Sequence, residues 1–321
     1  MKNLLLTGGC GFLGAALCRY VLANTDWNVT VLDKLDEAGS LNRIADLRDG
    51  YPSRLRMFWH DLRAPINPVM LRDHGRFDYV AHLAAASHVD RSIIDPTGYI
   101  LDNVLGTGHL LDYVRRNHLD AKTLVFSTDE VFGPAPDGIE YDEYSAHCSH
   151  NPYAASKAGA EALCPAYAIT YGMQITVSHC TNLYGPYQYR EKFVPLVAEK
   201  VTRGELVQIH TVGGTIASRY FLHVSDAARA VVTILERGGV IYGPDSGKYN
   251  ITGDREHGML SVAEQIAAVL GKPLHHELVE NPTSRPRPDR RYAIRGDKLA
   301  ALGWSPQVAF EDGLRDALGV T

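Results

Sequence analysis

Short apolar runs alternate with longer amphipathic stretches over the first 180 residues of the chain. The apolar runs have the unbroken hydrophobicity of strands buried in a parallel sheet, and they lie at residues 4–6, 29–32, 79–81 and 124–126. Residues 56–59 form a less apolar candidate strand. Helical patterns run over residues 12–22 and 99–116. Strands and helices in this alternation predict an α/β fold, a Rossmann-type doubly wound parallel sheet.

The pattern breaks up beyond about residue 185. Helical stretches at residues 191–203, 225–236 and 261–270 are mixed with short strands and turns. A segment rich in Pro and Arg, residues 282–291, predicts a loop. We therefore expect one domain over residues 1–180 and a smaller C-terminal α/β portion over residues 181–321, with the chain crossing between the two.

Composition narrows the class of protein. The chain has 321 residues, of which 45% are hydrophobic and 21% are charged, the balance of a globular protein. A formal net charge of −5 gives no basic surface for nucleic acid, and no apolar run approaches the roughly 20 residues that cross a bilayer. The five cysteines include no Cys-x-x-Cys pair, and the histidines include no His-Glu-x-x-His motif. We therefore expect a cytoplasmic protein that needs no membrane, nucleic acid or metal.

Three glycines, Gly8, Gly11 and Gly14, follow the first predicted strand and open the first predicted helix. Glycine lets the backbone turn sharply and approach a pyrophosphate, whose charge is stabilised at the helix N-terminus. Asp33 ends the second strand, where it can accept hydrogen bonds from an adenosine ribose and repel a 2′-phosphate. This pattern predicts NAD rather than NADP. Asp61, after residues 56–59, is either an adenine contact or the cap of a turn or helix.

Two adjacent carboxylates, Asp129 and Glu130, follow Thr128 at the end of the strand predicted around residues 123–126. Such a pair is costly in a purely structural role, because like charges repel and burial disfavours them. It suits a reaction that needs an acid and a base on one substrate. The alternative is an ordinary solvated turn.

Tyr153 and Lys157 stand four residues apart, which places them on one face of a helix. An ammonium group near a phenol favours the phenolate, so we expect Lys157 to lower the pKa of Tyr153 and make it a usable base. The spacing also arises by chance, and it gains weight from the glycine motif and Thr128 that precede it.

Together these motifs resemble the extended short-chain dehydrogenase/reductases, and more narrowly the nucleotide-sugar 4,6-dehydratases, with the dTDP-glucose type closest. The matching stretches run nearly end to end, and they are residues 7–14, 33–35, 82–85, 87–92, 127–133, 153–157, 184–188 and 289–294. The Asp129-Glu130 pair is the part of the match that is most specific to the dehydratases, because related epimerases and decarboxylases usually lack the Asp.

The resemblance implies an NAD-dependent cycle without net oxidation. Tyr153, activated by Lys157, would take the proton of the sugar C4 hydroxyl while hydride leaves C4, and Thr128 would hydrogen-bond the C4 oxygen. Glu130 would then remove the C5 proton, and Asp129 would protonate the departing C6 hydroxyl before hydride returns to C6. Asp129 should therefore hold a proton while Glu130 is ionised, since neighbouring like charges separate two pKa values.

The resemblance also assigns binding residues. Further NAD contacts would come from Phe12, Leu13, Lys34, Leu62, Leu83, Ala84 and Ala85. The nucleotide sugar, bound mainly by residues 181–321, would contact Ser87, Asn182, Lys192, Arg219, Asn250, Arg290 and Tyr292. An arginine fork suits phosphate oxygens, and the alternative for each arginine is a solvated surface charge.

Departures from the family pattern fall on the expected cofactor and substrate walls, at Ala86, Asp102, Leu183, Tyr220, Arg287 and Pro288. Asp102, for example, stands where Thr is usual. These departures leave the nucleotide and the sugar open, so that a dehydratase acting on a UDP-sugar is one alternative. A 4-epimerase or decarboxylase on the same scaffold is another, and a non-enzymatic nucleotide-binding regulator is a third. The resemblance also implies a homodimer through residues 99–116 and 153–171, unless these helices simply cover the sheet.

Overall fold

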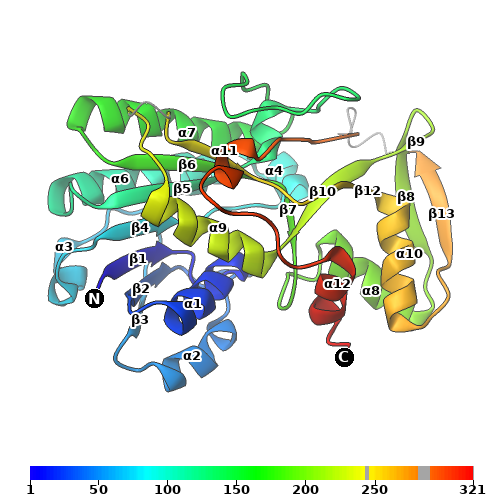
Figure 1. The fold of residues 1–321 in the computed structure, drawn as a ribbon, viewed down its shortest axis with the longest axis horizontal. Coiled ribbons are helices and arrows are strands. Elements are labelled where there is room, and N and C mark those ends of the chain that lie inside the picture. Colours follow the sequence, from blue (N-terminus) through cyan, green and yellow to red (C-terminus); the bar gives the residue numbers. More distant parts are fainter. Residues whose placement is uncertain (243–245, 281–289, 321) are drawn as a thin grey trace.

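A seven-stranded parallel sheet forms the larger part of the molecule (Figure 1). The computed structural model describes residues 1–242, 246–280 and 290–320. The strand order is β11-β6-β5-β4-β1-β2-β3, and every neighbouring pair is parallel. The strands are β1 (Asn3–Thr7), β2 (Asn28–Asp33), β3 (Leu55–Trp59), β4 (Tyr79–His82), β5 (Lys122–Thr128), β6 (Ile175–Cys180) and β11 (Lys248–Ile251). This order confirms the predicted doubly wound fold, with the reversal of strand order between β1 and β4.

Helices cover both faces of this sheet, and each face has its own hydrophobic core. Leu4 and Leu6 of β1 pack toward one face, whereas Leu5 packs toward the other, as the two-residue period of a strand requires. On the first face lie α1 (Phe12–Asn24) and α9 (Val224–Arg237). On the second face lie α6 (Gly106–Asn117) and α7 (Pro152–Tyr171). The apolar runs of the sequence are therefore buried on both sides.

Shorter elements connect the strands of the large sheet. They are η1 (Leu41–Arg43), α2 (Ala45–Gly50), α3 (Pro68–Leu71), η2 (Arg72–His74), α4 (Val89–Ile94), α5 (Pro96–Tyr99), the π-helix η3 (Ile100–Leu105) and η4 (Asp129–Phe132). The helix predicted over residues 99–116 is thus divided between the end of α5, η3 and α6.

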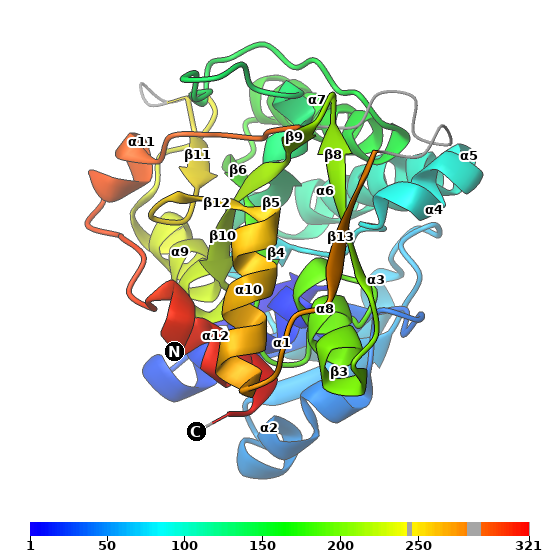
Figure 2. The ribbon, with the colours of Figure 1, turned by 90° about the vertical axis from the view of Figure 1, so that its right-hand side faces the viewer.

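The C-terminal portion, whose elements face the viewer in Figure 2, has a separate core between two three-stranded sheets and three helices. The sheets have the orders β12-β10-β7 and β13-β8-β9. The strands are β7 (Asn182–Tyr184), β8 (Val207–Val212), β9 (Thr215–Ile216), β10 (Ser218–His223), β12 (Glu256–Gly258) and β13 (His276–Glu280). The helices are α8 (Phe193–Arg203), α10 (Met259–Leu270) and α12 (Phe310–Leu318).

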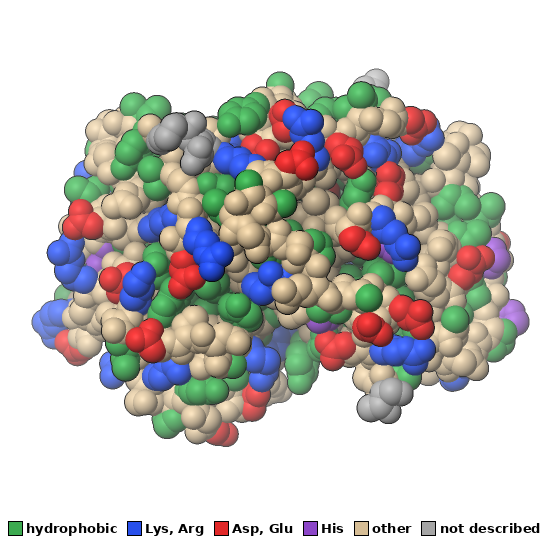
Figure 3. Space-filling model, viewed as in Figure 1, with side chains coloured by type: hydrophobic (Ala, Val, Ile, Leu, Met, Phe, Trp, Pro, Cys, Tyr) green, Lys and Arg blue, Asp and Glu red, His purple; other side chains and the backbone are tan. Residues whose placement is uncertain are grey.

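The two parts exchange segments. Helix α9 and strand β11 come after residue 180 but pack on and extend the large sheet, and α11 (Asp297–Ala300) lies against β11. The predicted loop over residues 282–291 lies almost wholly outside the described residues. Acidic and basic side chains are interspersed on the face shown in Figure 3. Within the described ranges, no helix is long and apolar enough to cross a membrane.

Candidate active site

A cavity of about 650 Å³ lies at the carboxyl ends of the sheet strands, between the large sheet and the C-terminal portion. A smaller cavity of about 100 Å³ adjoins it and shares Gly8, Gly11, Leu83 and Ala85 with it. The larger cavity is lined by most of the predicted residues, namely Gly8, Gly11, Phe12, Leu13, Gly14, Leu83, Ala85, Ser87, Thr128, Asp129, Glu130, Tyr153, Lys157, Asn182, Lys192 and Arg219. The smaller cavity is lined by Asp33, Lys34, Asp61, Leu62 and Ala84.

The glycine-rich turn brings backbone close to backbone. A Cβ atom on Gly8, whose φ is +76°, would lie 2.7 Å from the backbone nitrogen of Ala84. A Cβ atom on Gly14 would lie 2.0 Å from the carbonyl oxygen of Gly8. Helix α1 begins directly after Gly11, which offers no side-chain cap, so its first N–H groups face the cavity region. This turn fits a pyrophosphate held at a helix N-terminus.

Asp33 is held in a fixed orientation at the end of β2. Its Oδ2 accepts the N–H of Cys10 at 2.9 Å, and its Oδ1 accepts the N–H of Leu35 at 2.8 Å. Burial raises the pKa of Asp33, and these two hydrogen bonds oppose that shift. Because Asp33 lines the smaller cavity, the arrangement fits an adenosine ribose there, and NAD therefore fits the two adjoining cavities.

Asp129 is the most strongly buried acid at the larger cavity, with 4% of its surface exposed. Thr128 caps η4 by accepting the N–H of Glu130 at 3.3 Å, and its hydroxyl donates to Oδ1 of Asp129 at 3.1 Å. Within the described part of the chain, Oδ2 of Asp129 has no hydrogen-bond partner. Burial, followed by the charge of Glu130, raises the pKa of Asp129 to about 7. Asp129 is therefore ready to act as an acid near neutral pH.

Glu130, beside Asp129, is half-buried and also lines the cavity. Its Oε2 accepts a hydrogen bond from Nδ2 of Asn151 at 2.8 Å. The Oδ1 atom of Asn151 accepts the N–H of Ala154, so the same side chain caps α7. Sequence reasoning missed Asn151, although an Asn immediately before Pro152 at a helix start was a visible signal.

Tyr153 and Lys157 lie one turn apart on α7 and both line the cavity. Burial and the charge of Glu130 raise the pKa of Tyr153, whereas a hydrogen bond with Thr128 lowers it. Nζ of Lys157 donates to the carbonyl oxygen of Phe126 at 2.6 Å, and burial lowers the pKa of Lys157 to about 8. The pKa of Tyr153 is thus raised, where a low pKa was expected, and burial is the largest cause.

Three cationic residues were expected near the nucleotide, and they lie at different depths. Lys192 lines the cavity, and its Nζ donates to the carbonyl oxygen of Ser87 at 3.0 Å. Arg219 of β10 lines the cavity too, with its guanidinium 4.9 Å from the ring centre of Tyr292. Arg290 lies on the surface, 3.0 Å from Asp137.

Tyr292 and Arg290 are not among the residues that line the larger cavity in the described part of the chain, so their contact with substrate stays a prediction. The ring of Tyr292 is buried against Arg219, and the carbonyl oxygen of Arg290 accepts a hydrogen bond from Arg219 at 2.9 Å. Both residues therefore contact Arg219 and help to hold its side chain in place.

Asn250 is the clearest correction among the predicted substrate contacts. It lies on β11, is 0% exposed and does not line the cavity. Its Nδ2 donates to the carbonyl oxygens of Tyr141 and Arg295 at 3.2 and 3.1 Å, and its Oδ1 lies 3.0 Å from Nδ1 of His179. All of its hydrogen-bonding groups are used within the protein, so Asn250 has a structural role.

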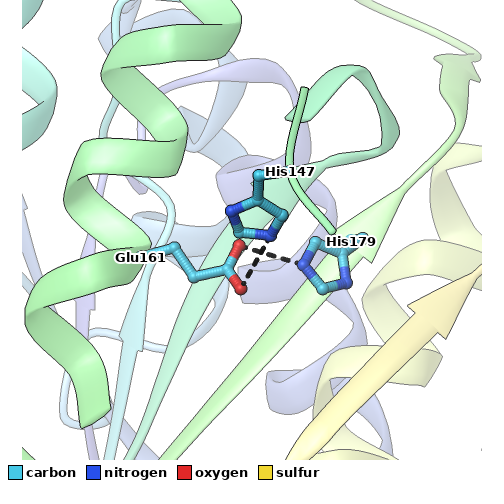
Figure 4. Close-up of side chains that lie close together, drawn as sticks. All are labelled: His147, Glu161 and His179. Carbon is cyan, nitrogen blue, oxygen red and sulfur yellow. Dashed lines mark hydrogen bonds and ion pairs between the residues drawn. The ribbon is translucent and has the colours of Figure 1, made fainter. Parts of the chain in front are cut away.

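Through His179, Asn250 contacts a buried polar cluster of His147, Glu161 and His179, and Figure 4 shows these three side chains. Glu161 points from α7 between His147 and His179, which lie 3.3 and 3.0 Å from its carboxylate oxygens. Although these three side chains have the spacing of metal ligands, Nζ of Lys248 lies 2.8 Å from Oε1 of Glu161. The carboxylate is thus already paired with Lys248 and in contact with both histidines, and the cluster is explained as a polar network that holds the fold.

The structure also shows where most of the residues that depart from the family pattern lie. Ala86 and Asp102 line the smaller cavity, and Leu183 lines the larger one. Tyr220 donates a hydrogen bond to Glu140 at the surface. Arg287 and Pro288 lie outside the described residues.

Sequence reasoning did not anticipate the cavity's outer wall on α8, β8 and α10, which adds Lys200, Gln208, His210 and Met259. No signal in the sequence showed that these four residues line the cavity, because only the tertiary fold brings them there.

Comparison with known proteins adds to this geometry. A family model described as GDP-mannose 4,6 dehydratase matches residues 5–317. The dTDP-glucose 4,6-dehydratase 1 of Escherichia coli K12 is 38% identical over 338 residues, covering 98% of this chain and 91% of that protein. The structure of DesIV, a dTDP-glucose 4,6-dehydratase from Streptomyces venezuelae with NAD bound, has a TM-score of 0.88 and 32% identity, covering 99% of this chain and 96% of that one. A UDP-glucose 4-epimerase from Thermus thermophilus in complex with NAD has a TM-score of 0.85 and 28% identity, covering 99% and 98%.

Proposed function

The chain belongs to the GDP-mannose 4,6-dehydratase family, and we propose that it is an NAD-dependent lyase that removes water from dTDP-glucose to give the 4-keto-6-deoxy sugar nucleotide. One observation carries this proposal. A buried carboxyl group with a pKa of about 7, Asp129, stands beside Glu130 at the cavity that Tyr153 also lines. An elimination needs a base at C5 and an acid at C6, whereas an epimerisation at C4 needs only one group that takes and returns the proton of the C4 hydroxyl.

We assign the first step to Tyr153, Thr128 and Lys157. When bound, NAD accepts hydride from C4 and later returns it to C6, and its positive ring favours ionisation of a nearby phenol. Tyr153 takes the proton of the C4 hydroxyl, and the Thr128 hydroxyl orients the same oxygen. Lys157 has a pKa near 8, so it is largely charged at neutral pH and stabilises the phenolate.

Asp129 and Glu130 carry out the elimination. Once C4 is a ketone, the C5 hydrogen is acidic, and Glu130 removes it as a proton. Asp129 gives its proton to the C6 hydroxyl, which leaves as water. Burial keeps Asp129 protonated until that moment, and Asn151 holds the Glu130 carboxylate in place through the bond to its Oε2. The protons balance over the whole cycle. Glu130 returns to C5 the proton that it took, as hydride returns to C6. The proton that Tyr153 takes from the C4 hydroxyl replaces the one that Asp129 gives to the departing water.

The sugar nucleotide would occupy the part of the larger cavity that the C-terminal portion lines. Ser87 and Asn182, which line this cavity, would contact the sugar, and Lys192 would lie near the pyrimidine. Arg219, supported by Tyr292, is placed to pair with the diphosphate oxygens. Burial lowers the pKa of Lys192, and the charges of Glu130 and Glu191 oppose that shift.

Incubation of the holoenzyme with dTDP-glucose, followed by mass spectrometry, tests this function. The expected product has lost one water, with no net consumption of NAD. An unchanged mass with an inverted C4 configuration would instead establish the epimerase, which the structural likeness to the Thermus thermophilus enzyme makes the natural rival. Loss of carbon dioxide from a UDP-glucuronate substrate would establish the decarboxylase. Parallel reactions with UDP-glucose decide the nucleotide.

We also propose that the enzyme is a homodimer through the exposed surface of η3, α6 and α7. Apolar side chains are exposed there, with Leu105 40% and Ile169 71% accessible. Light scattering of the purified protein should give twice the chain mass, and Ile169→Asp should give a monomer. A wild-type monomer would refute the dimer.

The five cysteines are all free and four are buried, which supports a reduced, cytoplasmic setting.

A further inference from the structure

An ion network that the reaction does not use lies at the edge of the smaller cavity, where Asp102 and Lys34 line the wall and Arg63 contacts Asp102 from outside it. Asp102 lines this cavity and bridges two cations. Its Oδ1 lies 3.1 Å from Nζ of Lys34 and 2.7 Å from Nε of Arg63, and its Oδ2 lies 3.0 Å from Nη2 of Arg63. Lys34 directly follows Asp33, the predicted ribose contact, and it also lines the cavity. The bridge therefore lies at the adenosine end of the NAD site.

Asp102 is brought to this place by the π-helix η3 (Ile100–Leu105). The next residue, Asn103, is buried and bonds the backbone of Ala86 through both ends of its side chain. These bonds fix η3 against the loop after β4, so that Asp102 points into the cavity wall. The side chain of Asp102 is 13% exposed, compared with 29% for Lys34 and 43% for Arg63. Partial burial strengthens such a pair relative to one in open solvent.

The electrostatics agree with a tight bridge. Burial alone would lower the pKa of Lys34, but the charge and hydrogen bond of Asp102 raise it. Burial would likewise raise the pKa of Asp102, but Arg63 and Lys34 lower it. All three groups are thus charged at neutral pH, and Asp102 contacts both cations. Asp36 also pairs with Lys34, with its Oδ2 3.3 Å from Nζ, so Asp102 is the acid that the two cations share.

A lysine and an arginine beside an adenosine ribose are the groups that bind a 2′-phosphate, because they offer charge-assisted hydrogen bonds. We propose that Asp102 is a cofactor-specificity residue, which holds Lys34 and Arg63 in a closed bridge and so denies them to the 2′-phosphate of NADP. Asp33 excludes this phosphate directly, and Asp102 excludes it by occupying the cations that would bind it. The proposal rests on the NAD dependence proposed above.

Isothermal titration of the purified protein with NAD and with NADP tests the proposal by binding rather than by activity. Asp102→Asn keeps the size of the side chain but removes the charge that the two cations share, so that Lys34 keeps only its pair with Asp36. Its affinity for NADP should rise about tenfold relative to its affinity for NAD. The gain should be larger at low salt, because phosphate binding by exposed cations is screened. Asp102→Thr serves as a second variant if Asp102→Asn does not fold.

Two controls separate the bridge from a general loss of negative charge. Asp73→Asn removes the same charge at an exposed site paired with Arg72, outside both cavities, and should leave the NADP to NAD ratio unchanged. Asp102→Asn combined with Lys34→Met should lose the gain. An unchanged ratio in Asp102→Asn, or a gain that persists without Lys34, would overturn the proposal. Failure of the wild type to bind NAD would instead refute the proposed function.

Discussion

Asp129 illustrates how a position in the fold decides the chemistry of a single residue. From the sequence, the neighbouring acids predicted two separated pKa values, and the structure gives Asp129 a pKa of about 7 because it is buried beside Glu130. The direction was predictable from the adjacency of two carboxylates. The raised pKa of Tyr153 was not, because it depends on burial that only the complete cavity wall creates.

Stability should report the protonation of Asp129. The folded protein binds this proton between the unfolded pKa of 3.8 and the folded pKa of about 7, so the folded state holds more protons than the unfolded state in that window. Stability must therefore fall as the pH rises through it, by up to about 4 kcal/mol for a shift of this size. Asp129→Asn should remove this dependence and be more stable than the wild type at pH 8.

Chemical denaturation of both proteins at pH 5 and pH 8 measures this difference. Asp73→Asn, an exposed acid paired only with its neighbour Arg72 in the described structure, is the matched control and should follow the wild type. Parallel pH profiles for Asp129→Asn and the wild type would show that Asp129 is not buried as an acid.

Glu130 offers a kinetic prediction at the same scale. Glu130→Gln should permit hydride transfer from C4 but stop removal of the C5 proton, since the amide is not a base. Turnover should fall on the order of 10²-fold or more, and NADH absorbance should build up on the enzyme. Rapid-mixing absorbance at the NADH band provides the measurement, with Glu199→Gln on α8 as control. Normal product formation without NADH would remove Glu130 from the base role.

At the scale of elements, the main strands and helices followed from the sequence, because continuous apolar runs and 3.6-residue periods are local signals. The helices predicted at residues 191–203, 225–236 and 261–270 agree with α8, α9 and α10 to within two residues at each end. The π-helix η3 could not be predicted. Its extra residue per turn is held by Asn103 bonding to Ala86 and Ser156, which are tertiary contacts.

Helix α7 connects capping to catalysis through Asn151. This side chain accepts the N–H of Ala154 and donates to Glu130, both at 2.8 Å. Asn151→Ser keeps a capping oxygen but loses the donor to Glu130, whereas Asn151→Ala loses both. We expect Asn151→Ala to cost about 1 kcal/mol of stability and Asn151→Ser much less. Both should slow the elimination by about 10- to 100-fold, because Glu130 is no longer held in place.

Thermal unfolding and single-turnover rates separate the two effects of Asn151. A cap without a catalytic role would give Asn151→Ser a normal elimination rate. A catalytic contact without a cap would give both variants the same stability as the wild type.

At the scale of the whole molecule, the cavity forms where the carboxyl ends of the parallel strands meet the C-terminal portion. The sequence identified the residues on the sheet side, since they follow recognisable strands or begin helices. It misplaced Asn250 because the same motif can bind a ligand or fill a core, and the distinction depends on where β11 joins the sheet. Strand β11 lies beside β6 only because the chain returns from the C-terminal portion.

That return of the chain is secured by the cluster around Glu161. Glu161 on α7 contacts His179 on β6, Lys248 on β11 and His147 in the segment before α7. Phe132, at the end of η4, packs with its ring centre 4.6 Å from that of His179, so the network also lies behind the segment that carries Asp129 and Glu130. One buried carboxylate therefore joins four segments that are far apart in the sequence.

Glu161→Gln should destabilise the whole molecule, because it leaves Lys248 and the buried ring of His179 without the carboxylate that they contact, at a cost of about 3 kcal/mol or more. Burial alone would raise the pKa of Glu161, but the charge and hydrogen bonds of His179 and His147 and the charge of Lys248 outweigh it and lower that pKa. A carboxylate with a lowered pKa stabilises the fold above its unfolded pKa of 4.5, and the contribution is lost as the pH falls below it. The stability gap between the wild type and Glu161→Gln, measured by urea denaturation, should thus be full at pH 7 and shrink toward pH 4. Glu264→Gln, an exposed acid on α10, should show no gap at either pH. A gap that stays constant with pH would mean that Glu161 acts through its shape rather than through its charge.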